Sequence, residues 1–139
     1  MNEIDFYKFD GAGNDFVVVD ARGSDMVFTA DQVARLCHRR RGIGADGLMS
    51  LHGTEADGFD FAMRYYNSDG STGPMCGNGG RCIAYFAHRL GLGHDGSLRF
   101  VGPDGEHEAR ILVEDDQQHV ALVRLSMCDV RCADVRRCL

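Results

Sequence analysis

The segment Met75-Cys76-Gly77-Asn78-Gly79-Gly80-Arg81-Cys82 is followed by an apolar run from Ile83 to Leu90, and together they are the most informative part of the chain. The run is apolar at nearly every position, and Gly91 stands where glycine commonly ends a helix, so we predict a helix over residues 83–90. A helix that is apolar on nearly every face must be surrounded by protein. The sequence therefore predicts a central helix that is entered through a glycine-rich turn.

Short apolar segments on both sides of this helix predict the sheet that surrounds it. We expect strands near residues 4–9, 16–19, 48–51, 59–65, 97–101, 106–113 and 119–126. The last three are joined by the turns Asp104-Gly105 and Asp115-Asp116, which is typical of a meander. Thr29 is in position to cap a further helix over residues 31–40. The expected fold is α+β: a curved, mostly antiparallel or mixed β-sheet, from half-barrel to barrel, wrapped around the central helix.

Length, composition and charge narrow the class of protein. A chain of 139 residues, 44% hydrophobic and 26% charged, is typical of one globular domain. The net charge of −6 implies no basic face for nucleic acid, and no stretch approaches the roughly 20 apolar residues needed to cross a bilayer. Six cysteines without a recognisable signal peptide indicate reduced thiols. We therefore expect a cytoplasmic protein with neither a nucleic-acid nor a membrane partner.

Cys76 is the candidate catalytic residue. It precedes the start of a helix, where unpaired backbone N–H groups and the positive end of the helix dipole stabilise a thiolate. Gly77 and Asn78 let backbone amides approach an anion closely, and a substrate carboxylate is the obvious anion. Asn14 and Asn67 lie in predicted turns, and their side chains both donate and accept hydrogen bonds, which suits a zwitterionic amino acid. The pattern indicates chemistry at the α-carbon of an amino acid.

The remaining cysteines predict no further site. Cys82 falls within the apolar stretch and is expected in the core. Cys128, Cys132 and Cys138 have the spacing C-x3-C-x5-C, which matches neither a zinc ribbon nor a common iron–sulfur pattern. We therefore expect no metal site.

Four segments of the chain resemble, in the same order, successive motifs of the diaminopimelate epimerase family. They are Phe9-Asp-Gly-Ala-Gly-Asn-Asp-Phe16, Arg41-Gly-Ile-Gly-Ala-Asp-Gly47, Tyr66-Asn-Ser-Asp-Gly-Ser71 and Met75-Cys-Gly-Asn-Gly-Gly-Arg-Cys82. Four motifs in order are far more specific than any one of them. The resemblance extends across essentially the whole chain but covers only the N-terminal half of the family, whose members have two similar halves facing each other across the active site.

The resemblance implies an isomerase that interconverts LL- and meso-diaminopimelate, on the route to lysine and peptidoglycan, without metal, pyridoxal phosphate or other cofactor. It implies that each half is a barrel of strands around a central helix. Two cysteines, one from each half, flank the α-carbon: one removes the proton as thiolate and the other delivers a proton to the opposite face. Cys76 matches the first of these. Gly77 and Asn78 match the positions whose backbone amides hold the α-carboxylate, and Asn14 and Asn67 match asparagines that contact the substrate.

The chain departs from the family pattern in two respects. Gly47 stands where some members carry a glutamine that contacts the substrate, so we expect this contact to be missing or supplied by water. Only one cysteine turn of this kind is present, and residues 127–139 resemble the passage from a first domain, 1–126, to a second domain that is absent. We therefore expect a half-enzyme that is unable to epimerise alone, and its exposed half-interface favours self-association, for example as a homodimer.

The sequence leaves three other functions open. The chain could belong to a different cofactor-independent amino-acid racemase, because residues that read the far end of diaminopimelate would lie mostly in the other half. It could be a non-catalytic amino-acid-binding domain, which the reactivity of the Cys76 thiol would distinguish. It could also be a redox or metal-binding thiol protein, which the metal content of the purified, reduced protein would test.

Overall fold

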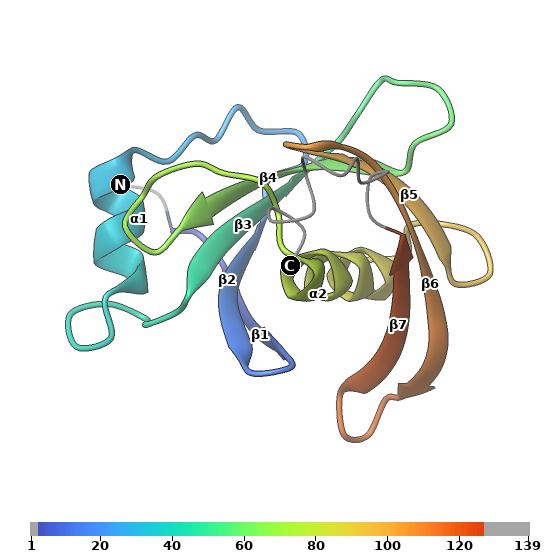
Figure 1. Cartoon of the computed structure of the whole chain (residues 1–139). Coiled ribbons are helices and arrows are strands. Elements are labelled where there is room, and N and C mark those ends of the chain that lie inside the picture. Colours follow the sequence, from blue (N-terminus) through green and yellow to red (C-terminus); the bar gives the residue numbers. More distant parts are fainter. Residues whose placement is uncertain (1–2, 127–139) are drawn as a thin grey trace, which may run out of the picture.

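The computed structural model describes residues 3–126, and Figure 1 shows how its elements follow one another. Their order along the chain is β1 (Tyr7–Gly11), β2 (Asn14–Asp20), α1 (Ala30–Cys37), β3 (Gly47–His52), β4 (Phe61–Asn67), α2 (Gly77–Arg89), β5 (Ser97–Gly102), β6 (Gly105–Asp115) and β7 (Val120–Ser126). Within this part of the chain the strands form one seven-stranded sheet.

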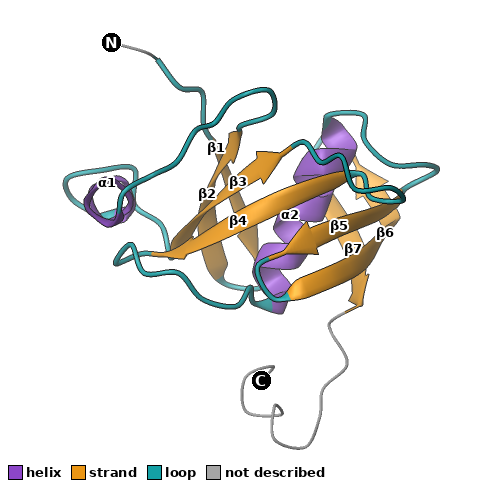
Figure 2. Cartoon of the chain, turned by 90° about the horizontal axis from the view of Figure 1, so that it is seen from above, coloured by secondary structure: helices purple, strands orange, loops and turns teal. Residues whose placement is uncertain are grey.

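The sheet keeps the order of the chain, so each strand lies beside its sequence neighbours. β2 and β3 are parallel, as are β4 and β5, whereas the other four neighbouring pairs are antiparallel. The sheet curls around α2, which contacts β1, β2, β3, β6 and β7, and Figure 2 shows the helix inside this curl. The predicted α+β fold, a curved and mostly antiparallel sheet wrapped around a central helix, is confirmed.

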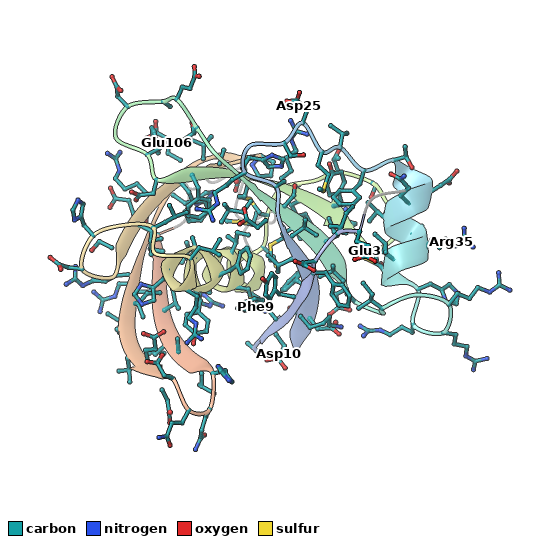
Figure 3. All side chains as sticks on the ribbon, turned by 180° about the vertical axis from the view of Figure 1, so that it is seen from behind. Glu3, Phe9, Asp10, Asp25, Arg35 and Glu106 are labelled. Atoms are coloured by element: carbon teal, nitrogen blue, oxygen red, sulfur yellow. The ribbon has the colours of Figure 1, made fainter. Side chains whose placement is uncertain are left out.

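The main core lies between α2 and the concave face of the sheet. The side chains of residues 82–87 are buried along α2, as its apolar sequence predicted. Phe61 of β4 and Phe100 of β5 lie opposite each other on neighbouring strands, and their rings stack with centroids 4.7 Å apart. Phe9 of β1 packs edge-on against Phe86, and Figure 3 shows Phe9 beside the helix. Burying a large apolar side chain stabilises a fold by about 1.5–3 kcal/mol, so these contacts hold the sheet onto the helix.

The other helix, α1, starts where the sequence predicted but ends earlier. Thr29 caps it through a capping box. The helix ends at Cys37 rather than at residue 40, because His38 takes an extended conformation. The Nδ1 atom of His38 accepts hydrogen bonds at 3.1 Å from the backbone N–H groups of Arg40 and Arg41, which turns the chain away from the helix axis.

The prediction of a glycine-rich turn before a helix starting at Ile83 is wrong. α2 begins at Gly77, and Cys76 is its N-cap with an extended backbone (φ −84°, ψ 160°). The N–H of Gly80 donates to the Cys76 carbonyl oxygen at 3.0 Å, which is the first helical hydrogen bond. Packing favours glycine here: a Cβ added to Gly80 would lie 2.5 Å from Cδ2 of Leu125 in β7, so that side chain would have to move. Close contact with the sheet therefore outweighs the low helix propensity of glycine.

Other element boundaries differ from the prediction by a few residues. The first strand begins at Tyr7 rather than near Ile4, whose side chain is 45% exposed outside the sheet. Neither helix between residues 3 and 126 is long and apolar enough to cross a membrane. Residues 127–139 lie outside the described residues, so the expected domain boundary at residue 126 stays a prediction.

Candidate active site

Cys76 is the accessible thiol of the described part of the chain. Its side chain is exposed, whereas Cys37 and Cys82 are only 3% and 5% exposed. Burial raises the pKa of the Cys37 thiol and raises that of Cys82 to about 12. The Sγ atom of Cys76 accepts a hydrogen bond from the backbone N–H of Gly79 at 3.3 Å. The structure therefore confirms the core position predicted for Cys82 and leaves Cys76 open to reagents.

The first four N–H groups of α2 lie at the Cys76 end of the helix, and two of them have an acceptor among the described residues. The N–H of Gly79 donates to Sγ and that of Gly80 to the Cys76 carbonyl. No acceptor within residues 3–126 takes the N–H of Gly77 or Asn78, because both lie in the first turn of α2. Free N–H groups at the positive end of a helix dipole are suited to bind a carboxylate. The structure thus puts the predicted anion-binding positions next to the candidate acid/base thiol.

The β1–β2 hairpin brings Asn14 to the same end of the helix. The Nδ2 atom of Asn78 donates to Oδ1 of Asn14 at 2.7 Å, and Nδ2 of Asn14 donates to a carboxylate oxygen of Asp46 at 3.2 Å. Gly11 allows this close approach, because a Cβ there would lie 3.1 Å from Sγ of Cys82 and 3.3 Å from the Asn78 carbonyl oxygen. Two candidate asparagines that are far apart in the sequence therefore form one hydrogen-bonded pair.

Asn67 lies at the same end of the sheet but is not joined to this pair. It ends β4 opposite Gly47 of β3, and Gly47 in turn lies opposite Phe16 of β2. Its Nδ2 atom donates to Oγ of Ser71 at 3.1 Å, within the loop that follows β4. No hydrogen bond between described residues connects Asn67 to the other four candidate residues. Its contact with a substrate stays a prediction.

The place of the glutamine expected from the family pattern is tightly packed. A Cβ on Gly47 would lie 2.8 Å from the Tyr66 carbonyl oxygen and 3.1 Å from the Tyr65 hydroxyl. Burial raises the pKa of this Tyr65 hydroxyl to about 12, and the nearby Cys76 and Asp46 add to the effect. The neutral Tyr65 hydroxyl therefore lies close to the point where any side chain at position 47 would begin.

Sequence reasoning missed a charged cluster behind the asparagine pair. The guanidinium of Arg39 donates to both carboxylate oxygens of Asp15, at 2.7 and 2.8 Å, and to Asp46 at 3.1 Å. These bonds from Arg39, and a further one from Lys8, hold the pKa of Asp15 well below its usual range. Both aspartates lie inside the sequence motifs quoted above, but they are 31 positions apart, and nothing local indicates their pairing without the β2–β3 register.

The structure adds no metal site to this arrangement. Within residues 3–126, no group of three or more His, Cys, Asp or Glu side chains is arranged to hold a metal ion. Cys128, Cys132 and Cys138 lie outside the described residues.

Comparison with known proteins identifies related chains. The family model described as diaminopimelate epimerase matches residues 6–131. The diaminopimelate epimerase of Chlorobaculum tepidum is 47% identical over 106 residues, which cover 76% of this chain and 40% of the relative. That of Flavobacterium psychrophilum is 45% identical over 112 residues, which cover 78% of this chain and 42% of the relative. The chain thus spans well under half the length of these relatives.

Solved structures share the fold at lower identity. A phenazine biosynthesis protein of the PhzF family from Bacillus anthracis matches 90% of this chain and 40% of its own, with a TM-score of 0.64 and 21% identity. A hydroxyproline epimerase from Agrobacterium vitis, solved with bound trans-4-hydroxy-L-proline, matches 88% of this chain and 40% of its own, with a TM-score of 0.64 and 15% identity. At such identities the likeness shows the fold alone. The family match, which spans most of the chain, shows that this chain belongs to the diaminopimelate epimerase family.

Proposed function

We propose that this chain supplies one half of the catalytic site of a cofactor-independent isomerase that epimerises LL-diaminopimelate to meso-diaminopimelate. The observation that carries the proposal is the exposed sulfur of Cys76 at the N-cap of α2, next to the unpaired backbone N–H groups of Gly77 and Asn78. A carboxylate held by these donors brings the α-carbon attached to it toward the sulfur. Asn14, Asn67 and the side chain of Asn78 are proposed to bind the polar groups around that carbon.

The chemistry requires both a base and help for the charge that develops. The α-proton of an amino acid is weakly acidic, and its removal moves negative charge onto the carboxylate. Backbone N–H groups and the helix dipole stabilise that charge without reorganising during the reaction. In the proposed role, Cys76 takes the proton as a thiolate or returns one as a thiol.

Inversion also needs a second acid or base on the opposite face of the α-carbon. Within residues 3–126 the other two cysteines are buried, so neither can reach a substrate beside Cys76. We therefore propose that a second cysteine, supplied by the other half of the active site and not by this chain, completes the site, and that this chain alone does not epimerise. A cytoplasmic location, where thiols stay reduced, and a homodimer belong to the same proposal.

Alkylation of Cys76 by a carboxylate reagent tests the proposed anion site on the chain itself. Iodoacetate carries a carboxylate and iodoacetamide does not, so the ratio of their rates reports how strongly the site attracts an anion. A helix N-terminus contributes about 0.3–1 kcal/mol to such an interaction, so we expect the iodoacetate-to-iodoacetamide ratio at Cys76 to exceed that of free cysteine by about two- to fivefold. Mass spectrometry of the labelled peptide assigns the rates to Cys76.

Gly77→Pro and Gly77→Ala form a matched pair for this assay. Proline removes one of the two N–H donors, is well tolerated at the first helical position, and follows a Cys76 backbone that is already extended. Alanine keeps the donor, and its Cβ meets only the Arg81 guanidinium, at 3.5 Å or more. The iodoacetate preference should fall in the proline variant and persist in the alanine variant. A preference that is absent from the wild type, or equal in both variants, contradicts the proposed anion site.

The half-enzyme proposal has its own test. The chain is incubated with LL-diaminopimelate in deuterated water, and the α-proton signal and the stereochemistry are followed by NMR. We expect no sustained exchange with inversion. Catalytic turnover with inversion by the chain alone would contradict the proposal that it supplies only one half of the catalytic site.

A further inference from the structure

A chain of hydrogen bonds with a single direction runs through the candidate site. The guanidinium of Arg81 donates to Oδ1 of Asn78. Nδ2 of Asn78 donates to Oδ1 of Asn14 at 2.7 Å, and Nδ2 of Asn14 donates to Oδ2 of Asp46 at 3.2 Å. A guanidinium only donates and a carboxylate only accepts, so the two ends of the chain have opposite and fixed roles.

The carboxylate end is itself held in place by the backbone. Oδ2 of Asp46 also accepts the N–H of Asp15 at 3.1 Å, while the N–H of Asp46 donates to the Asp15 carbonyl at 2.9 Å and to its carboxylate at 3.1 Å. Oδ1 of Asp46 accepts a hydrogen bond from Arg39 at 3.1 Å, and the same guanidinium donates two hydrogen bonds to the Asp15 carboxylate. The Asp46 carboxylate therefore cannot turn away from Asn14 without also breaking its bonds with the Asp15 N–H and the Arg39 guanidinium.

These fixed ends decide how the two amides point. If the Asn14 amide were reversed, its oxygen would face the Asp46 carboxylate and its NH2 group would face the NH2 group of Asn78. Both contacts would leave like groups opposed in a half-buried place, which is costly. In the observed orientation, each amide satisfies both of its neighbours and keeps one N–H and one oxygen lone pair for a ligand.

We propose that Asp46 is a positioning residue that sets the orientation of the Asn14 and Asn78 side-chain amides, so that the site presents one fixed pattern of donors and acceptors to an amino-acid substrate. Arg81 defines the opposite end of the same chain. The nature of the ligand rests on the proposed function, whereas the orientation of the amides rests on the hydrogen bonds alone.

The test uses the substitution Asp46→Asn and follows the side-chain amides by NMR in labelled protein. The introduced amide has the same size as the carboxylate but can donate or accept, so it no longer dictates the orientation of Asn14. We expect the side-chain amide protons of Asn14 and Asn78 to exchange with water at least about fivefold faster in D46N, because a charge-assisted hydrogen bond is roughly twice as strong as a neutral one. The NMR coupling across the hydrogen bond from Nδ2 of Asn78 to Oδ1 of Asn14 should also weaken. A general loosening of the fold would weaken the other hydrogen-bond couplings as well, so a change confined to this bond indicates lost positioning.

Asp20→Asn is the matched control. Asp20 ends the same strand as Asn14, and its carboxylate accepts two bonds from the Arg22 side chain, at 3.0 and 2.9 Å, outside the site. D20N should leave the amide signals of Asn14 and Asn78 unchanged. Arg81→Gln, at the other end of the chain, should release Asn78 more than Asn14, and it keeps the test available if D46N unfolds.

The result decides this inference separately from the proposed function. If D46N and R81Q leave exchange and coupling at Asn14 and Asn78 unchanged, Asp46 does not position the amides, whatever the alkylation of Cys76 shows. If the amides respond as expected but Cys76 has no preference for iodoacetate, the positioning stands and the proposed function fails.

Discussion

Replacing Gly80 by alanine tests whether the glycine-rich stretch is part of a packed helix. A Cβ at this position would lie 2.5 Å from Cδ2 of Leu125, and 2.7 Å and 3.2 Å from Cε and Sδ of Met75. Both neighbours are the ends of flexible side chains, so they can move, but each has to give up contacts in the core. Overpacking of this kind costs about 1–3 kcal/mol, whereas alanine in place of glycine inside a helix contributes about 1 kcal/mol of stability.

The net expectation for Gly80→Ala is therefore a loss of about 1 kcal/mol in the free energy of unfolding. Gly77→Ala is the control, because its Cβ would meet only the Arg81 guanidinium at ordinary contact distances. That variant should gain up to about 1 kcal/mol, since alanine restricts the unfolded chain more than glycine does. The two variants should thus differ by roughly 1.5 kcal/mol, with opposite signs relative to the wild type.

Urea denaturation followed by circular dichroism measures this difference. The two midpoints are comparable if the slopes of the transitions agree, because equal slopes indicate the same change in exposed surface. If Gly80→Ala proves as stable as Gly77→Ala, Gly80 does not lie against Leu125 and Met75. The argument that packing, rather than an open turn, explains the glycines would then be refuted.

In the native protein, iodoacetamide should label Cys76 well before Cys37 and Cys82, because only Cys76 is exposed among the described thiols. Peptide mass spectrometry measures the order of labelling, and comparable early labelling of all three cysteines would contradict the described burial. Phe100→Ala should lower the free energy of unfolding by about 3–5 kcal/mol, because it empties the fully buried stack on Phe61; a urea midpoint near that of the wild type would count against the described core. Asp15→Asn should destabilise the protein at neutral pH, and because the folded pKa of Asp15 is depressed, this difference from the wild type should shrink as the pH falls below about 4. Denaturation curves at pH 7 and pH 3 measure the change, and a difference independent of pH would exclude the ion pairs with Arg39 and Lys8 as its source.

The sequence predicted the architecture because the strongest patterns in the chain are local. The run of apolar residues after Cys82 specified a buried helix, and the period-two patterns specified strands that could surround a single helix. The start of α2 was placed six residues too late because glycine has a low helix propensity. That propensity was overridden by tertiary contacts, such as that of Gly80 with Leu125, which no local pattern reveals.

The geometry of the site was predictable only where its residues are contiguous in the sequence. Cys76, Gly77 and Asn78 are neighbours in the sequence, so a helix N-terminus was enough to bring a thiol and backbone donors together. The bond between Asn14 and Asn78 joins residues 64 positions apart, and that between Asp15 and Asp46 spans 31 positions. These contacts depend on the parallel register of β2 and β3 and on the approach of the β1–β2 hairpin to α2, which periodicity alone does not determine.

One turn of helix serves both the core and the candidate site, and Gly79 shows how closely the two are linked. A Cβ at Gly79 would lie 3.3 Å from Sδ of the buried Met49 and 3.6 Å from Sγ of Cys76. The same added methyl group would therefore press on the core and come into contact with the sulfur. The backbone N–H of Gly79, which donates to that sulfur, is also fixed by this packing. A side chain at Gly79 should therefore affect both the stability of the fold and the environment of the thiol, so both should be measured in variants of this residue.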